Sequence, residues 1–202
     1  MSIWLGKDPL ILASQSRARQ MLLANAGIAF EAIPADIDER AVQRDSGLTA
    51  PGEIAKLLAR EKAQWVSLRK PGRLVVGADQ TLALGDRLFS KPAGRAQAAE
   101  QLRALGGHSH ELHAGFAVAR DGRILFADVS VARMSMRRLG ESEIEAYLDQ
   151  AGAAVTTSVG AYQLEGLGVN LFERIDGDHF TILGLPLLSL LAFLRSEKLL
   201  AI

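Results

Sequence analysis

The sequence predicts an α/β fold with a mixed, twisted β-sheet and flanking helices. Two short apolar runs, residues 10–13 and 74–76, are typical of strands covered on both faces, as in parallel sheets. Amphipathic helical patterns follow such runs along the chain. The dipeptide Asp121-Gly122, between two apolar strand-like segments, is a strong β-hairpin signal. Parallel and antiparallel pairing are therefore both expected.

Composition excludes several classes of protein. The chain has 202 residues, which fits one large domain or two small lobes around one core. Lys plus Arg and Asp plus Glu are 23 each, and aromatic residues are only 5%, which argues against a protein that coats nucleic acid. With no cysteine there is no disulfide, thiolate metal site or cysteine nucleophile. No signal peptide or membrane-spanning run is evident, so a soluble cytoplasmic protein is expected.

The first strand leads into a candidate anion site. Ser14, Ser16 and Arg19 follow the apolar run, and a helical pattern ended by Gly27 comes next. Free N–H groups at a helix N-terminus favour a phosphate, hydroxyls add donors, and arginine supplies a planar fork. The alternative, slightly favoured by these residues alone, is an ordinary helix cap and a solvated arginine.

A second strand, 30–33, precedes three carboxylates, Asp36, Asp38 and Glu39. They would suit a divalent cation, but a solvated acidic loop is the commoner arrangement. Pro51 then begins a helix with apolar residues on one side. Lys62 is placed at the edge of that side, where a side chain reaching into solvent is favoured over one pointing at a ligand.

The run 74–80 is predicted to be a strand that ends in Asp79. Ligands of α/β sheets gather beyond the carboxyl ends of strands, so Asp79 is a candidate for chemistry. A tight turn at Gly85-Asp86 would fold Lys91 back toward it. The competing interpretation, of similar weight from spacing alone, is that Asp79 only caps a turn.

The remaining chain alternates helices, strands and loops. A helix over 94–105 stops at Gly106-Gly107, and the three histidines that follow are expected at the surface rather than around a metal. The other expected elements are strands 110–120 and 124–136, a helix 142–150, a glycine-punctuated loop 160–168, a hairpin of 169–175 with 179–183, and a final helix from Pro186.

Several motifs, each weak alone, together resemble one family, the Maf nucleotide pyrophosphatases. They occur in the family's order over nearly the whole chain, which makes the set specific. They are Leu12-Ala13-Ser14-Gln15-Ser16-Arg17-Ala18-Arg19-Gln20-Met21-Leu22, Asp36-Ile37-Asp38-Glu39, Leu58-Ala59-Arg60-Glu61-Lys62-Ala63, Gly77-Ala78-Asp79, Lys91-Pro92, Gly160-Ala161-Tyr162, Gly166-Leu167-Gly168 and Gly184-Leu185-Pro186.

The resemblance implies an elongated, two-lobed fold related to the inosine triphosphatases, with residues 1–202 as one domain around a central cleft. It implies a cytoplasmic house-cleaning hydrolase that uses a divalent metal, Mg or Mn, to split nucleoside triphosphates into a monophosphate and pyrophosphate. Asp79 corresponds to the family's proton acceptor, with base and metal-ligand roles both open. The polar pocket positions are Ser14, Ser16, Arg19, Glu39, Lys62 and Lys91, with Glu39 and Asp79 as the metal ligands.

Departures from the family pattern concern the base. Ala18 stands where the motif usually has arginine, and Gln80 where many members have threonine. At Gln80 and Glu165 the chain resembles the branch of the family that prefers 7-methyl-GTP. An amide and a carboxylate would suit the cationic methylated purine of that substrate. An alternative is a nucleotide-sensing module of cell division. No nucleic-acid or membrane partner is expected, and monomer and homodimer are both left open.

Overall fold

A computed structural model describes residues 3–202 of the chain. It divides into two compact units. The first comprises the chain up to Gln80 together with Ala114–Ser130 and His179–Ile202, and the second comprises Thr81–His113 and Val131–Asp178. Three long strands contribute residues to both units.

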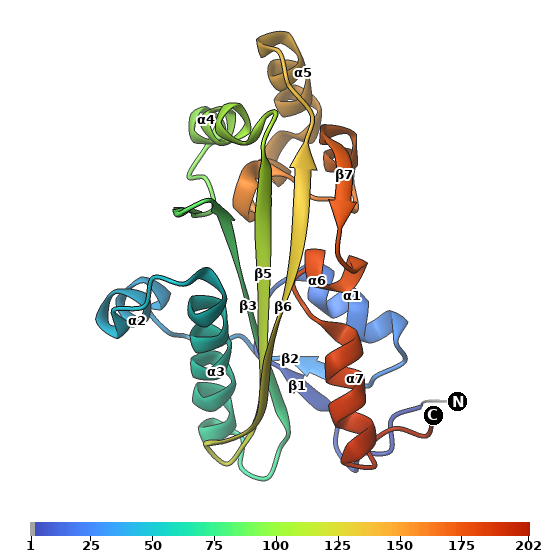
Figure 1. The fold of residues 1–202 in the computed structure, drawn as a ribbon. Helices are drawn as coiled ribbons and strands as arrows, with labels where there is room; N and C mark the ends of the chain where they lie inside the picture. The colour runs from blue at the N-terminus through green and yellow to red at the C-terminus, as the bar shows by residue number, and fades with distance from the viewer. Residues whose placement is uncertain (1–2) are drawn as a thin grey trace. The chain divides into compact units, whose positions relative to one another are not determined.

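The elements confirm the predicted mixed α/β class (Figure 1). The strands are β1 (Leu10–Leu12), β2 (Phe30–Ala32), β3 (Val75–Leu84), β4 (Arg87–Phe89), β5 (Ser109–Arg120), β6 (Arg123–Met136) and β7 (Phe172–Asp176). The α-helices are α1 (Arg17–Asn25), α2 (Glu39–Ser46), α3 (Pro51–Arg69), α4 (Arg95–Leu105), α5 (Glu141–Ala151), α6 (His179–Ile182) and α7 (Leu187–Ser196). Short 3-10 turns are η1 (Gly152–Thr156), η2 (Val159–Ala161) and η3 (Leu167–Leu171).

The strands form a seven-stranded mixed sheet in the order β2-β1-β3-β5-β6-β7, with β4 paired to β3. In the first unit β1 runs parallel to both β2 and β3, with Leu12 opposite Val76. In the second unit β4 and β7 pair antiparallel with β3 and β6. The sheet is therefore parallel in the first unit around β1 and antiparallel at β4 and β7.

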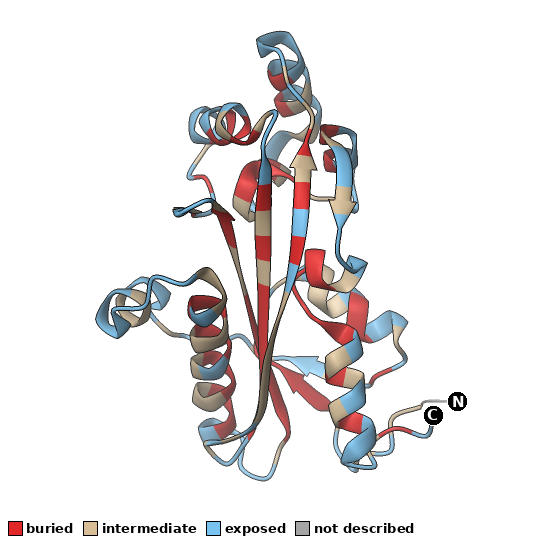
Figure 2. Cartoon of the chain, in the orientation of Figure 1, coloured by how far each residue is buried: buried red, intermediate tan, exposed pale blue. Residues whose placement is uncertain are grey.

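Helix α3 lies against the sheet of the first unit through a seam of small residues (Figures 1 and 2). A Cβ placed on Gly77 of β3 would lie 2.2 Å from the Ala59 carbonyl oxygen and 2.5 Å from the Ala63 nitrogen. A Cβ on Gly115 of β5 would lie 2.6 Å from the backbone of Ala55. Glycine thus permits a backbone approach that no other residue could make.

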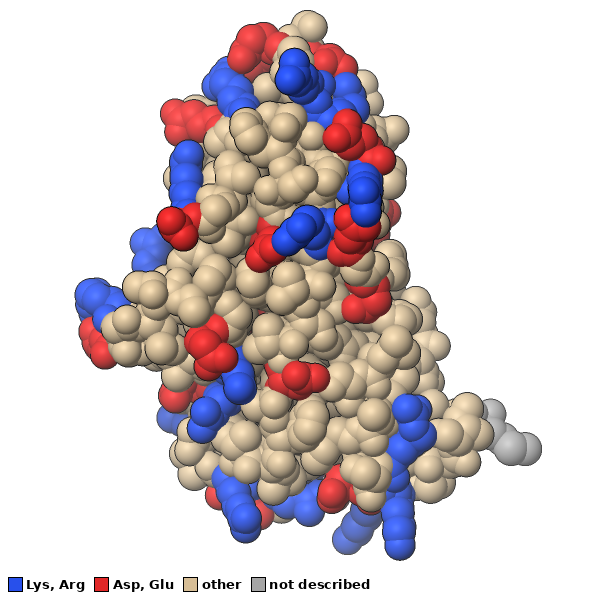
Figure 3. Space-filling model, viewed as in Figure 1, with Lys and Arg blue, Asp and Glu red and all other residues tan. Residues whose placement is uncertain are grey.

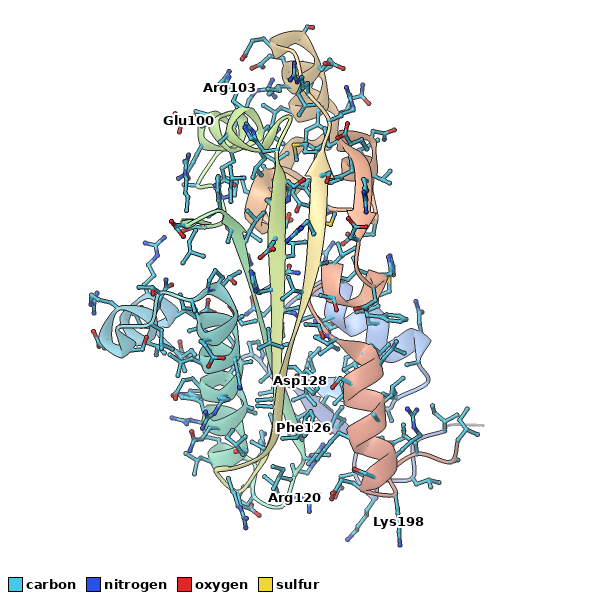
Figure 4. All side chains as sticks on the ribbon, in the orientation of Figure 1. Glu100, Arg103, Arg120, Phe126, Asp128 and Lys198 are labelled. Atoms are coloured by element: carbon cyan, nitrogen blue, oxygen red, sulfur yellow. The ribbon has the colours of Figure 1, made fainter. Side chains whose placement is uncertain are left out.

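Helix α7 belongs to the main core of the first unit. Its buried Leu190 and Leu194 join a cluster that includes Val76 and Phe116. Two residues of β6 labelled in Figure 4 lie beside this helix. Phe126 stacks on Phe193 with centroids 5.2 Å apart, and Asp128 accepts a 2.6 Å hydrogen bond from Ser189. Residues 3–202 contain no helix that is both long and apolar enough to cross a membrane.

In the second unit, α4 confirms the predicted helix and buries the apolar residues Ala98, Leu102 and Leu105. Ion pairs link its exposed side to α5. Arg103 binds Glu141 through two nitrogens, and Arg95 lies within 2.8 Å of Asp149. Acidic and basic side chains are interspersed over these helices in the view of Figure 3. Such exposed pairs add little stability but connect the two helices.

Strand β3 corrects the prediction that a strand ends at Asp79. The strand continues without a break to Leu84, so Asp79 lies in its middle and caps no turn. The neighbouring strand β1 ends at Leu12, opposite Val76. Asp79 is therefore beyond the carboxyl end of β1, where a parallel sheet leaves room for a ligand. The expectation was right about position but chose the wrong strand.

The predicted hairpin of 169–175 with 179–183 is wrong. Strand β7 pairs with β6, and residues 179–182 form the short helix α6. Local hydrogen bonds close this turn, from Leu183 N to the His179 oxygen at 3.1 Å and from Gly184 N to the Thr181 oxygen at 3.0 Å. Gly184 has a φ of +86°, which glycine adopts without strain. The predicted hairpin was placed around Asp176-Gly177-Asp178, but the chain after this turn forms helical hydrogen bonds instead of a strand.

The prediction that the histidines are superficial is wrong for His110. His108 is exposed, but His110 on β5 is buried and its Nε2 lies 2.7 Å from the Tyr162 hydroxyl. Its Nδ1 is buried with no hydrogen-bond partner among residues 3–202. Burial lowers the pKa of His110 to about 4, so the ring is neutral at pH 7. It contributes to a core contact of the Gly160-Ala161-Tyr162 segment.

Gly77→Ala is expected to destabilise the fold because its Cβ would collide with the backbone of α3. Overpacking of this kind costs about 1–3 kcal/mol, and a backbone obstacle places the effect at the upper end of that range. Chemical denaturation measures the loss. Gly94→Ala is the matched control, because a Cβ there meets nothing within 4 Å and the backbone is extended. Equal stability of both variants would contradict the close seam.

His110 predicts an acid-dependent loss of stability. The unfolded chain protonates this ring below pH 6.5, whereas the folded protein does so only near pH 4. Since the unfolded state binds more protons in that window, the free energy of unfolding should fall as the pH drops, by at most ~1.4 kcal/mol per pH unit. His110→Phe should remove this part of the slope. His108→Phe, at an exposed position, should keep it.

Candidate active site

Asp79 is the centre of a charged cluster in the first unit. Its residue is 9% exposed, on β3 just beyond the end of β1. Lys62 donates a 2.5 Å hydrogen bond from Nζ to Asp79 Oδ1. An ionised carboxylate is seldom buried unless a cation accompanies it. The hydrogen bond occupies Oδ1, so Oδ2 is the oxygen left for a proton or a cation.

Lys62 does not snorkel into solvent, which corrects the prediction from its helix position. It is 8% exposed and belongs to the buried face of α3, together with Leu58, Ala59 and Ala63. The buried face of α3 combines large apolar residues, such as Leu58 and Val66, with the alanines at 55, 59 and 63. Because the alanines bring α3 close to β3, a lysine on this face reaches Asp79.

Glu39 completes the cluster from the first position of α2. Its Oε1 lies 2.7 Å from Lys62 Nζ, and its side chain is 51% exposed. Asp38 is the N-cap of the same helix and accepts a 3.0 Å hydrogen bond from Ala41 N. Asp36 is exposed. The three carboxylates therefore have different roles, and residues 3–202 hold no group of three acidic, His or Cys side chains suited to a metal.

Two carboxylates nevertheless fit a divalent cation here. The Lys62 ammonium lies within 2.7 Å of both Glu39 and Asp79, so the pair already shares one positive charge. Carboxylate oxygens are ligands that Mg²⁺ and Mn²⁺ prefer. Mg²⁺ is commonly held by one or two carboxylates, with water and substrate phosphates completing its shell. The donor set is thus adequate for a metal that arrives with a phosphate substrate.

Electrostatics favour a proton-accepting role for Asp79. Burial raises the pKa of its carboxyl above the ordinary value, while the charges of Lys62 and Arg19 act against the rise. A carboxylate whose pKa is raised toward neutrality is a better general base than a solvated one.

Arg19 is tied into the site rather than solvated, which excludes the cap-and-solvent interpretation for this residue. Its Nε donates to the Gly184 oxygen at 2.8 Å, and its Nη1 donates to the Ala78 oxygen at 2.8 Å and to Ser14 Oγ at 3.1 Å. Nη2 makes no hydrogen bond within the part of the chain that the structure describes. That nitrogen could still meet an anion.

Ser14 and Ser16 have different roles: Ser16 caps the helix α1, and Ser14 binds Arg19. Ser16 is the N-cap of α1 and accepts a hydrogen bond from Arg19 N at 3.4 Å. Ser14 is buried and accepts from Ser16 N at 3.2 Å as well as from Arg19. The first N–H groups of α1 have no partner inside the helix, as at any helix N-terminus. The expected anion site therefore has the required local structure.

Gln80 holds the turn after α6. Its Nε2 donates to the carbonyl oxygens of Thr181 and Ile182, each at 3.0 Å. Both amide protons are thereby committed, and Oε1 remains as an acceptor. Sequence reasoning missed the backbone partners of Gln80 and Arg19. The only signal was Gly184-Leu185-Pro186, where a glycine with positive φ makes the turn.

Three further predicted positions belong to α1 and to the second unit. Ala18 is half-buried on α1, and Lys91 and Glu165 are exposed residues of the second unit. In that unit the Gly160 N–H donates to Gln101 at 3.1 Å. The structure thus brings together Ser14, Arg19, Glu39, Lys62, Asp79 and Gln80. The roles of Lys91 and Glu165 stay predictions.

Comparison with known proteins agrees with the motifs. A family model described as Maf-like protein matches residues 9–197. Over 202 residues the chain is 70% identical to a nucleoside triphosphate pyrophosphatase of Bradyrhizobium diazoefficiens, with both chains fully covered. It is 51% identical over 192 residues to a 7-methyl-GTP pyrophosphatase of Brucella abortus, covering 94% of this chain and 96% of that protein.

Among solved structures, a nucleoside-triphosphatase (dITP/XTP pyrophosphatase) of Mycobacterium abscessus matches with a TM-score of 0.43 and 16% identity. The match covers 94% of this chain and 98% of that one. A likeness at this level carries no inference about function.

Arg19→Lys is expected to destabilise the first unit although the charge is kept. A lysine cannot reproduce the fork that binds Gly184, Ala78 and Ser14 together. Loss of hydrogen bonds from a charged donor costs about 1.5–3 kcal/mol, measured by urea denaturation. Arg17→Lys is the control, since Arg17 is exposed on the same helix. A stable Arg19→Lys protein would show that the fork is dispensable for folding.

Proposed function

Since the chain belongs to the Maf family, we propose that it is a hydrolase that splits nucleoside triphosphates into a nucleoside monophosphate and pyrophosphate. The observation that carries the proposal is the buried carboxylate of Asp79, held by Lys62 beside the N-terminus of α1. A base, cations and an anion-binding helix end are the groups that phosphoanhydride hydrolysis requires.

Asp79 is the proposed proton acceptor. Water attacks the α-phosphorus, forming a new P–O bond as the bond from that phosphorus to the bridging oxygen breaks. The water proton passes to Asp79, and pyrophosphate leaves with the bridging oxygen. Oδ1 is the oxygen that binds a cation, Lys62 in this structure, so Oδ2 is the oxygen that takes the proton. The raised pKa of Asp79 suits this role.

Positive groups stabilise the charge that develops on the leaving pyrophosphate. In this proposal Lys62, Nη2 of Arg19 and Lys91 act on the phosphates, and Ser14, Ser16 and the first N–H groups of α1 hold them in place. Glu39 and Asp79 are the residues that would hold a divalent cation. When bound, such a cation neutralises phosphate charge.

Base selection is proposed for Gln80, with Ala18 and Glu165 as further positions. The committed amide protons of Gln80 limit it to accepting a hydrogen bond through Oε1. It would therefore meet a donor on the base rather than an acceptor. A modified purine nucleotide, as in the 7-methyl-GTP pyrophosphatase relative, is the candidate substrate for this chain in the cytoplasmic nucleotide pool.

Asp79→Asn is expected to lower kcat/KM by at least ~10²-fold, because an amide cannot accept the water proton. Pyrophosphate release measures the loss, and near-ultraviolet circular dichroism checks that the fold persists. Asp86→Asn, in the exposed turn between β3 and β4, should retain full activity. Full activity of Asp79→Asn would remove Asp79 from the mechanism.

A screen of ordinary and modified nucleotides, with Mg²⁺ and with Mn²⁺, tests the activity itself. Pyrophosphate and monophosphate should appear in equal amounts. Binding without turnover across the panel would contradict the proposal and favour a nucleotide-sensing role in cell division.

A further inference from the structure

The ammonium of Lys62 occupies the place where the two candidate metal ligands converge. Its Nζ lies 2.5 Å from Asp79 and 2.7 Å from Glu39, while its residue is 8% exposed. No other cation contacts either carboxylate within residues 3–202. Lys62 and Asp79 are both buried, so their contact replaces hydration that each has lost, whereas the Glu39 side chain remains half exposed.

We infer that Lys62 is an internal counter-cation, which a divalent ion displaces from Glu39 and Asp79 when it binds. The inference rests on the proposed function for the identity of the two ligands. A divalent ion that binds Asp79 Oδ1 and Glu39 Oε1 would lie at contact distance from the Lys62 ammonium, where the two cations repel each other strongly. Binding of a metal through these two oxygens and retention of both lysine contacts are therefore mutually exclusive.

The arrangement has two consequences for the protein. In the cation-free state Lys62 holds both carboxylates in place and offsets the repulsion between Glu39 and Asp79. It also lowers the apparent affinity for a divalent cation, because the ion has to compete with a covalently attached charge. The displaced ammonium, still on α3, is then available for the phosphates of a substrate.

Mn²⁺ titration of the purified full chain tests the competition directly. Free Mn²⁺ is measured by electron paramagnetic resonance, with no nucleotide present. Lys62→Met should bind Mn²⁺ at least tenfold more tightly than the wild type, and Mn²⁺ should raise its Tm more than that of the wild type. Lys56→Met, on the same helix and without an ion pair in the structure, should match the wild type. Equal or weaker binding by Lys62→Met would overturn the inference.

A second measurement uses the unmodified sequence and does not depend on the variant folding. Acylation of lysines, followed by mass spectrometry, reports how accessible each amine is. Mg²⁺ should increase the labelling of Lys62 several-fold and leave Lys56 unchanged, because displacement frees the buried ammonium. Unchanged or decreased labelling of Lys62 would show that it stays on the carboxylates. Neither readout needs turnover, so a failed nucleotide screen and a failed displacement remain distinguishable.

Discussion

The contact between Lys62 and Asp79 is the interaction on which the site depends, and it constrains everything around it. A buried carboxylate and a buried ammonium each lose hydration, which only a close partner offsets. Glu39 and Asp79 bring two negative charges, and Lys62 and Arg19 bring two positive ones, so the local sum is zero. A polyphosphate that enters this cluster adds negative charge, and the four side chains have no net positive charge left to offset it. In the proposed function, a divalent cation supplies the additional positive charge.

Packing makes that contact geometrically feasible. Gly77 and the alanines of α3 let the helix backbone approach β3 more closely than any larger side chain would permit. The glycine lies two residues before Asp79, so both point to the same side of the strand, which is the side of α3. Gly77, which allows the close approach of α3, and Asp79, which accepts the hydrogen bond from Lys62, thus lie on one face of β3. The packing requirement and the proposed catalytic role of Asp79 therefore depend on the same seam.

Much of the fold could be predicted from the sequence, because it is encoded in local patterns. The buried strand at 10–12, the hairpin at Asp121-Gly122 and the helix over 95–105 each depend on short-range periodicity or turn chemistry. The burial of Lys62 could not be predicted in this way, since a lysine beside an apolar helix face ordinarily extends into solvent and its partner Asp79 is on another element. The helix at 179–182 could not be predicted either, because Gln80, about a hundred residues away in the sequence, donates hydrogen bonds to its carbonyl groups.

The same distinction applies within the site. Asp79 could be identified as a candidate because carboxylates beyond strand ends are a general feature of α/β proteins. Arg19 could be predicted as a site residue from its guanidinium chemistry. Its hydrogen-bond partners could not be predicted, since they are the backbone oxygens of Ala78 and Gly184. Those oxygens have no signature in the sequence. Through them Arg19 joins the residue before Asp79 to the turn that Gln80 holds, so that a base, its neighbour in the strand and the glycine turn are positioned by one guanidinium. A single long-range fork therefore connects the strand of the proposed proton acceptor to the turn bound by the residue proposed to select the base.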